Sequence, residues 1–115
     1  MSADRRWQVR IEHILEAIAK IQQYTTGLTE DAFAGQSMVV DAVIRNFQVI
    51  GEAVRHVPDD VQARYSEVPW SLMQGMRHIL VHDYYAVKLD IVWRTIQQSL
   101  PPLLEPLRNI LKENT

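Results

Sequence analysis

The apolar residues of this 115-residue chain recur at spacings of three and four along almost its whole length. This spacing places them on one stripe of an α-helix, whereas a half-buried strand alternates apolar and polar residues with a period of two. No segment shows a convincing period-two alternation. Packed amphipathic helices are therefore the way in which this chain can bury its apolar residues, and we predict an all-α fold.

Four long segments carry the helical pattern, and glycine, proline and helix-capping residues separate them. Short connections between four main helices favour an antiparallel bundle, and the chain length is that of one domain, 1–115. Ser37 is placed to cap the second helix. The expected helices cover about residues 4–24, Ser37 to Val57, Pro69 through segment 77–84, and Lys88 onward.

Two short turns and one break are expected between and within these helices. Thr29 is suited to be the N-cap of a turn that continues through Phe33, and a second turn is expected between Pro58 and Tyr65. The pair at 101–102 should kink or restart the last helix, because an interior proline loses a hydrogen bond and clashes with the previous turn.

Composition excludes several functional classes. The chain has no cysteine, which excludes disulfides, thiolate metal sites and cysteine nucleophiles and fits a reducing cytosol. No run approaches the roughly 18 apolar residues of a membrane span, and the first residues lack the apolar core of a signal peptide, so we expect a cytoplasmic protein. The net charge of -2 provides no global attraction for nucleic acid, which would need a local cationic patch.

One octapeptide, RHILVHDY at 77–84, concentrates an arginine, two histidines, a carboxylate and a tyrosine. A fixed guanidinium binds phosphate and imidazoles move protons near neutral pH, so the set fits phosphate chemistry without a metal. On an ideal helix Arg77 and Tyr84 share a face, whereas His82 lies about 140° from Arg77. The two side chains, Arg77 and His82, can therefore bind one small group together only if the helix ends or bends near Val81, or if a second chain in a symmetric dimer completes the site.

Two other interpretations of the octapeptide stay open. An arginine and a histidine near a helix end are commonly solvated or complement the helix dipole, and a tyrosine there commonly packs on the surface. His78 and His82, four residues apart, also have the spacing of zinc ligands. The glutamate of the H-E-x-x-H zinc motif is absent, however, and Asp83 would point elsewhere on a helix.

Gly51 and Glu52 lie inside the second expected helix. Glycine in a helix costs about 1 kcal/mol relative to alanine, and the usual reason for its presence is the close approach of another helix. If the second and third helices are neighbours, Glu52 can reach the region of Arg77. His13 and His56 are isolated in the sequence, and we interpret them as surface or capping residues.

The octapeptide has the pattern R-x4-H-x-Y, which resembles the signature of HepT-type toxins, a branch of the HEPN superfamily. The segments 42–53, 68–70, 90–93 and 100–103 are similar as well, in order and spacing, so the resemblance covers about residues 5–107. It implies an antiparallel, HEPN-like bundle of four to five helices that forms a homodimer, with 1–115 as a single HEPN/HepT-like domain.

The resemblance also implies a function. Such toxins are metal-independent endoribonucleases without a cofactor, and they cleave RNA, for example tRNA or mRNA, but not DNA. Their antitoxin is an MntA-type nucleotidyltransferase that transfers AMP onto the motif tyrosine. Carried over to this chain, Arg77 and His82 would be catalytic and Tyr84 the AMPylated hydroxyl.

Three further residues are candidates for assisting roles, namely His78, Glu52 and Asp83. His78 departs from the family pattern, because many relatives have asparagine directly after the motif arginine. A different class of function stays open beside the nuclease. The chain would then be a non-catalytic, helical nucleotide- or partner-binding subunit of a nucleotidyltransferase complex, and the octapeptide would only dock its ligand.

Overall fold

The computed structural model describes residues 2–79 and 88–114, and it describes the side chains of residues 7–77 and 88–114. Helices account for nearly all of the described residues. No strand occurs within these ranges, so the predicted all-α class is confirmed. The elements are α1 (Ser2–Thr25), α2 (Glu30–Ala34), α3 (Ser37–Val54), α4 (Asp59–Arg64), α5 (Trp70–Ile79), α6 (Leu89–Arg94), the π-helical turn η2 (Thr95–Ser99) and α7 (Pro101–Glu113).

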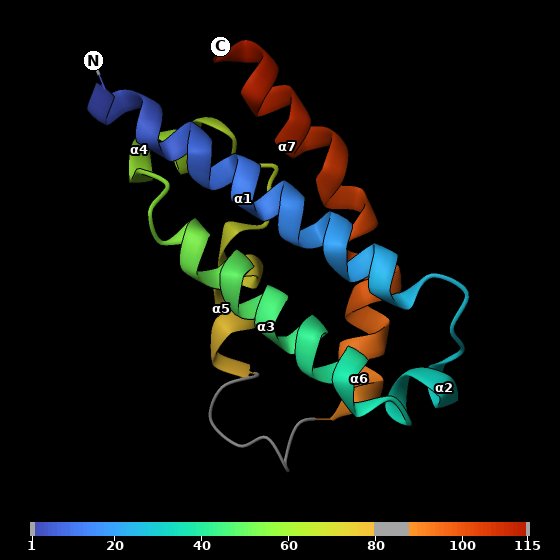
Figure 1. Cartoon of the computed structure of the whole chain (residues 1–115). Coiled ribbons are helices and arrows are strands. Elements are labelled where there is room, and N and C mark those ends of the chain that lie inside the picture. Colours follow the sequence, from blue (N-terminus) through green and yellow to red (C-terminus); the bar gives the residue numbers. More distant parts are fainter. Residues whose placement is uncertain (1, 80–87, 115) are drawn as a thin grey trace.

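The long helices form an antiparallel bundle with α1 at its centre. Figure 1 shows α1 between α3 and α7, running antiparallel to both, and α5 packs on α3. The short helix α2 joins the bundle through contacts with α3 and α6. None of the helices in the described ranges is long and apolar enough to cross a membrane.

The predicted apolar stripes form the core. Packing of these stripes against one another removes a contiguous apolar surface from water, which is the main stabilising contribution in such a bundle. The rings of Phe33 and Trp93 lie 5.4 Å apart and connect α2 with α6. The buried stripes of α1 and α3 consist of Trp7, Ile11, Ile14, Ile18 and Ile21 on one side and Val40, Val43, Ile44, Phe47, Ile50 and Val54 on the other.

The boundaries of α3 differ from the expected ones at both ends. Ser37 is its first helical residue rather than its cap, and Gln36 holds the N-cap position without a side-chain capping bond. The helix ends at Val54, where the amide of Val57 donates to the Val54 carbonyl in a tighter turn. Pro58 accounts for this turn, because it has no amide proton to donate to the Val54 carbonyl four residues before it.

The short turns occur where the sequence predicts them. Thr29 is the N-cap of α2, and its Oγ1 accepts a hydrogen bond of 3.1 Å from the amide of Ala32. The helix α4 fills the second expected turn. Pro69 lies directly before α5 rather than in its first turn, and its carbonyl accepts from the amide of Met73 at 3.1 Å.

The last helix restarts at its proline pair, as predicted, but a π-helical turn precedes the restart. The amide of Leu100 donates to the carbonyl of Thr95, five residues back, at 3.1 Å. The rings of Pro101 and Pro102 would clash with carbonyls in the preceding turn of a regular helix. A wider turn relieves this clash, and the two prolines then begin α7, where their missing amide protons are not needed.

Candidate active site

The helices α3 and α5 pack closely where Gly51 faces the backbone of Arg77. A Cβ atom placed on Gly51 would lie 2.5 Å from Cβ of Arg77 and 2.9 Å from its backbone nitrogen. No side chain fits into this space, so the close approach requires glycine. The predicted reason for a glycine inside this helix is confirmed, and the residue that it accommodates is the arginine of the octapeptide.

Glu52 follows Gly51 on α3 and forms an ion pair with the same arginine. Its Oε1 lies 3.6 Å from Nε of Arg77, which confirms that Glu52 reaches this residue. The carboxylate also accepts a hydrogen bond of 3.3 Å from Nη1 of Arg55 and lies 3.3 Å from Nε2 of His56. One carboxylate thus connects two guanidinium groups and one imidazole. His56 is exposed, as expected of a surface residue, and the structure adds its contact with Glu52.

This environment keeps Glu52 ionised. The hydrogen bond with His56 lowers the pKa of the Glu52 carboxyl, and the charges of Arg55 and Arg77 lower that pKa further against an opposing desolvation effect. Because the folded-state pKa lies below the ordinary value of 4.5, the ion pair is fully formed above that pH and is lost only as the pH falls through the lowered pKa. Arg77 has its counter-charge throughout the neutral range.

Part of the Arg77 guanidinium stays available to a ligand. Its side chain is 39% exposed, and the contact with Glu52 engages Nε. Within the described part of the chain, no other ion pair or hydrogen bond involves this guanidinium. A guanidinium presents five N–H groups in a planar fork, so the two terminal nitrogens can hold a phosphate or carboxylate group with two parallel hydrogen bonds.

The remaining residues of the octapeptide are not placed relative to Arg77. His78 belongs to α5, but its side chain lies outside the described residues, as do His82, Asp83 and Tyr84 altogether. Their predicted roles stay predictions. The described side chains contain no group of three or more histidine, aspartate or glutamate residues suited to a metal ion, and the proposed zinc pair, His78 and His82, falls outside this search.

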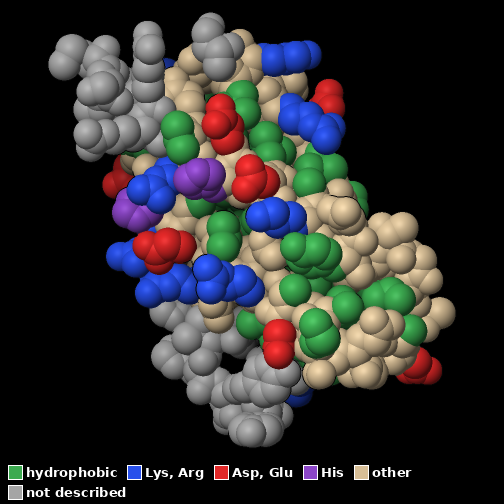
Figure 2. Space-filling view, in the orientation of Figure 1, with side chains coloured by type: hydrophobic (Ala, Val, Ile, Leu, Met, Phe, Trp, Pro, Cys, Tyr) green, Lys and Arg blue, Asp and Glu red, His purple; other side chains and the backbone are tan. Residues whose placement is uncertain are grey.

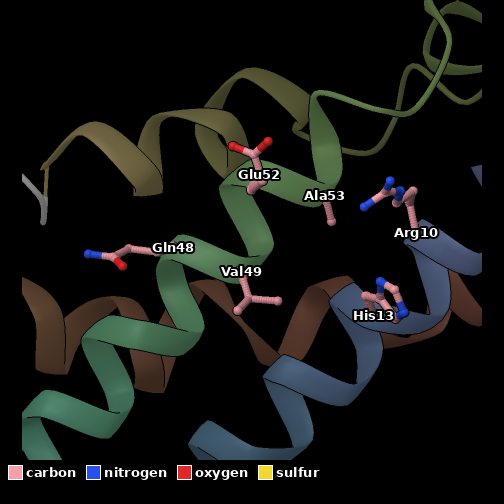
Figure 3. A pocket seen from close by; sticks show the side chains of 6 residues that line it. All are labelled: Arg10, His13, Gln48, Val49, Glu52 and Ala53. Atoms are coloured by element: carbon pink, nitrogen blue, oxygen red, sulfur yellow. The ribbon is translucent and has the colours of Figure 1, made fainter.

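A hollow of about 230 Å³ lies beside this cluster, between α1 and α3. Figure 3 shows Arg10 extending from α1 toward Ala53 on α3, His13 beside it on α1, and Glu52 on α3 with its carboxylate pointing away from α1. Figure 2 shows basic, acidic and histidine side chains gathered over the face where α1 and α3 lie side by side. The complete lining is Arg10, His13, Gln48, Val49, Glu52 and Ala53.

Sequence reasoning missed this hollow. Arg10 and His13 are three residues apart and so share a helix face. This spacing is the one feature of the sequence that could have indicated a site on this face. Their proximity to Glu52, about 40 positions later in the chain, follows from the packing of α1 on α3. The interpretation of His13 as an isolated surface residue is therefore incomplete, because this histidine is exposed but shares a hollow with two charged groups.

Comparison with known proteins points to one family. A family model described as "Ribonuclease HepT-like" matches residues 14–110, which is most of the chain. No solved structure matches the chain significantly.

Several curated relatives carry ribonuclease names. A protein of Methanocaldococcus jannaschii named "Gamma-glutamylcyclotransferase and putative RNase" is 36% identical over 92% of this chain, which spans 48% of that longer relative. A "Putative RNase" of Caldanaerobacter subterraneus is 32% identical over 90% of this chain and 92% of its own length. A "Probable ribonuclease HepT" of Thermococcus cleftensis is 34% identical over 81% of this chain and 84% of its own length.

The contact between Gly51 and Arg77 can be tested by comparing the same substitution, glycine to alanine, at two helical positions, Gly51 and Gly75. Gly51→Ala should lower the free energy of unfolding by about 1–3 kcal/mol, because the new methyl group meets backbone atoms that move only if α5 moves. Gly75→Ala on α5 should instead raise it by about 0.5–1 kcal/mol, since no atom lies within 4 Å of the added Cβ. Urea denaturation followed by circular dichroism measures both. Equal stability of the Gly51→Ala variant and the wild type would contradict the close approach.

Proposed function

Since the chain belongs to the HepT-like ribonuclease family, we propose that it is a metal-independent endoribonuclease and the toxin of a toxin–antitoxin pair. The observation that carries the proposal is the geometry of Arg77. Gly51 allows its backbone to lie against α3, Glu52 forms an ion pair with Nε, and 39% of the side chain is exposed. A cation fixed in this way suits the phosphate of an RNA linkage, whose negative charge grows in the transition state.

The proposed reaction is a transesterification within RNA. The ribose 2′-oxygen attacks the adjacent phosphorus, a new bond forms between them, and the bond from phosphorus to the 5′-oxygen of the next nucleotide breaks. His82 takes the proton of the 2′-hydroxyl, and Arg77 stabilises the charge on the phosphate oxygens. The products are a 2′,3′-cyclic phosphate and a free 5′-hydroxyl. DNA lacks the attacking hydroxyl and should stay intact.

The leaving 5′-oxygen needs a proton donor. We assign this role to a protonated imidazole, either that of His78 or one from a second copy of the chain. Acid–base assistance of this kind contributes about 10²–10⁴-fold to the rate. Glu52 acts through Arg77 as a positioning residue, and Asp83, next to His82, stays an assisting candidate.

Two partners belong to the proposal. A homodimer with twofold symmetry would place two copies of segment 77–84 opposite each other, which gives a strand two sets of imidazoles. An MntA-type nucleotidyltransferase would act as antitoxin by adding AMP to Tyr84. Tyr84 lies seven positions after Arg77, so on a continuous helix the added phosphate would be near the guanidinium and compete with RNA for it.

The nuclease can be tested by incubating purified, unmodified protein with single-stranded RNA and with DNA of the same sequence, in the presence of EDTA. The wild type should cut RNA alone, and Arg77→Ala and His82→Ala should each lower the rate at least about 100-fold. Arg108→Ala is the control, because this exposed arginine lies on α7 and is no part of the site. RNA that stays intact with the wild type would contradict the proposal, and so would site variants that cleave RNA as fast as the wild type does.

The regulation can be tested by intact mass spectrometry after co-expression with an MntA-type nucleotidyltransferase. We expect mass increments of one or more AMP units on the wild type, together with loss of RNA cleavage. Tyr84→Phe should show no increment and keep its activity during co-expression, because phenylalanine has no hydroxyl to modify. Increments on the Tyr84→Phe variant would assign the modification to another residue and contradict this part of the proposal.

A further inference from the structure

We propose that the hollow between α1 and α3 is a second phosphate site, in which Arg10 and His13 bind an RNA backbone phosphate that flanks the one at Arg77. The inference rests on the proposed ribonuclease function and extends its site from α5 to α1. The hollow belongs to the same surface as Arg77, because Glu52 both lines the hollow and forms the ion pair with Arg77.

Arg10 is the main reason to expect an anion here. Its side chain is partly buried between the two helices and extends toward the hollow (Figure 3). Among the residues whose side chains are described, Arg10 has no ion-pair partner and no hydrogen-bond partner. A partly buried cation without a counter-charge gains more from binding an anion than a fully solvated one, since less water screens the contact.

The one carboxylate in the lining does not supply this counter-charge. Glu52 is engaged by Arg55 and His56 on its own helix and by Arg77 on α5. None of the other five lining residues is acidic. The hollow and the ion-pair partners of Glu52 thus include three arginines, Arg10, Arg55 and Arg77, for one carboxylate. The chain as a whole has a net charge of -2. This surface is the local cationic patch that an acidic nucleic-acid enzyme needs.

The shape of the hollow favours a backbone phosphate over a small metabolite. Its volume of about 230 Å³ is below the range of roughly 300–1,000 Å³ that is typical of small-molecule sites. None of the six lining residues is phenylalanine, tyrosine or tryptophan, so the hollow lacks the large aromatic rings on which the bases of a single strand usually stack. Contacts to phosphate position a strand without reading its sequence, and we therefore expect the hollow to affect binding rather than the choice of cleavage site.

The test is the binding of fluorescein-labelled, 2′-O-methylated single-stranded RNA, which cannot be cleaved by attack of its 2′-oxygen, measured by anisotropy over a range of salt concentrations. Arg10→Gln should weaken binding by about threefold to tenfold and reduce the slope of log affinity against log salt by about 0.7, as expected for one lost phosphate contact. Arg10→Lys keeps the charge and should restore most of the affinity. Arg108→Gln, on α7, should bind like the wild type.

Cleavage kinetics provide a second readout. With unmethylated RNA, Arg10→Gln should raise KM by a similar factor and leave kcat unchanged, since the hollow does not contact the reacting atoms. His13→Gln should behave in the same way, with a smaller effect. Circular dichroism shows whether each variant has the wild-type helix content.

The outcomes separate this inference from the proposed function. Unchanged affinity and salt dependence in Arg10→Gln would overturn the second phosphate site, even if the wild type cuts RNA. An Arg10→Gln variant that loses affinity for the nucleotidyltransferase but not for RNA would also overturn the second phosphate site. Arg10-dependent RNA binding by a protein that cuts no RNA would support the phosphate site and contradict the nuclease.

Discussion

The close contact between Gly51 and Arg77 is the constraint on which the rest of the site depends. Because position 51 has no side chain, α5 lies against α3 at this level, and Arg77 begins at a fixed distance from the helix that carries Glu52. Arg77 is therefore positioned by the packing of two helices rather than by a loop. Rigid helices can hold a side chain more accurately than a loop can, which suits the phosphate contact that we propose for Arg77.

Charge is distributed unevenly over this protein. Its net charge of -2 would repel RNA at long range, yet Arg55 and Arg77 both pair with Glu52, and Arg10 lines the hollow beside them. Glu52 organises this patch without neutralising it, because one negative charge is shared among several cations. Under the proposed function, such an arrangement would restrict RNA binding to the face where α1, α3 and α5 meet, and the proposed AMP group near Arg77 would reduce the attraction of this face for RNA.

The sequence predicted what depends on local pattern and missed what depends on packing between distant segments. The apolar stripes, the Thr29 cap and the restart at Pro101 follow from periodicity and proline chemistry, and Gly51 was correctly interpreted as a close approach. The prediction that Ser37 caps the helix is wrong, because α3 already begins at Ser37 and Gln36 takes the N-cap position. The hollow could not be predicted, because it depends on the register in which α1 packs on α3, and that register sets the position of Arg10.

We propose that Glu52 acts on RNA cleavage through Arg77. A double-mutant cycle measures this directly, with kcat/KM for RNA cleavage determined for the wild type, Glu52→Gln, Arg77→Ala and the double variant. Alanine has no charged group, so it removes the ion pair with Glu52 without forming a new one. We predict that Glu52→Gln lowers kcat/KM about tenfold in the wild type and has no effect in the Arg77→Ala background. Equal losses in the two backgrounds would show that Glu52 acts independently of Arg77 and would contradict the account.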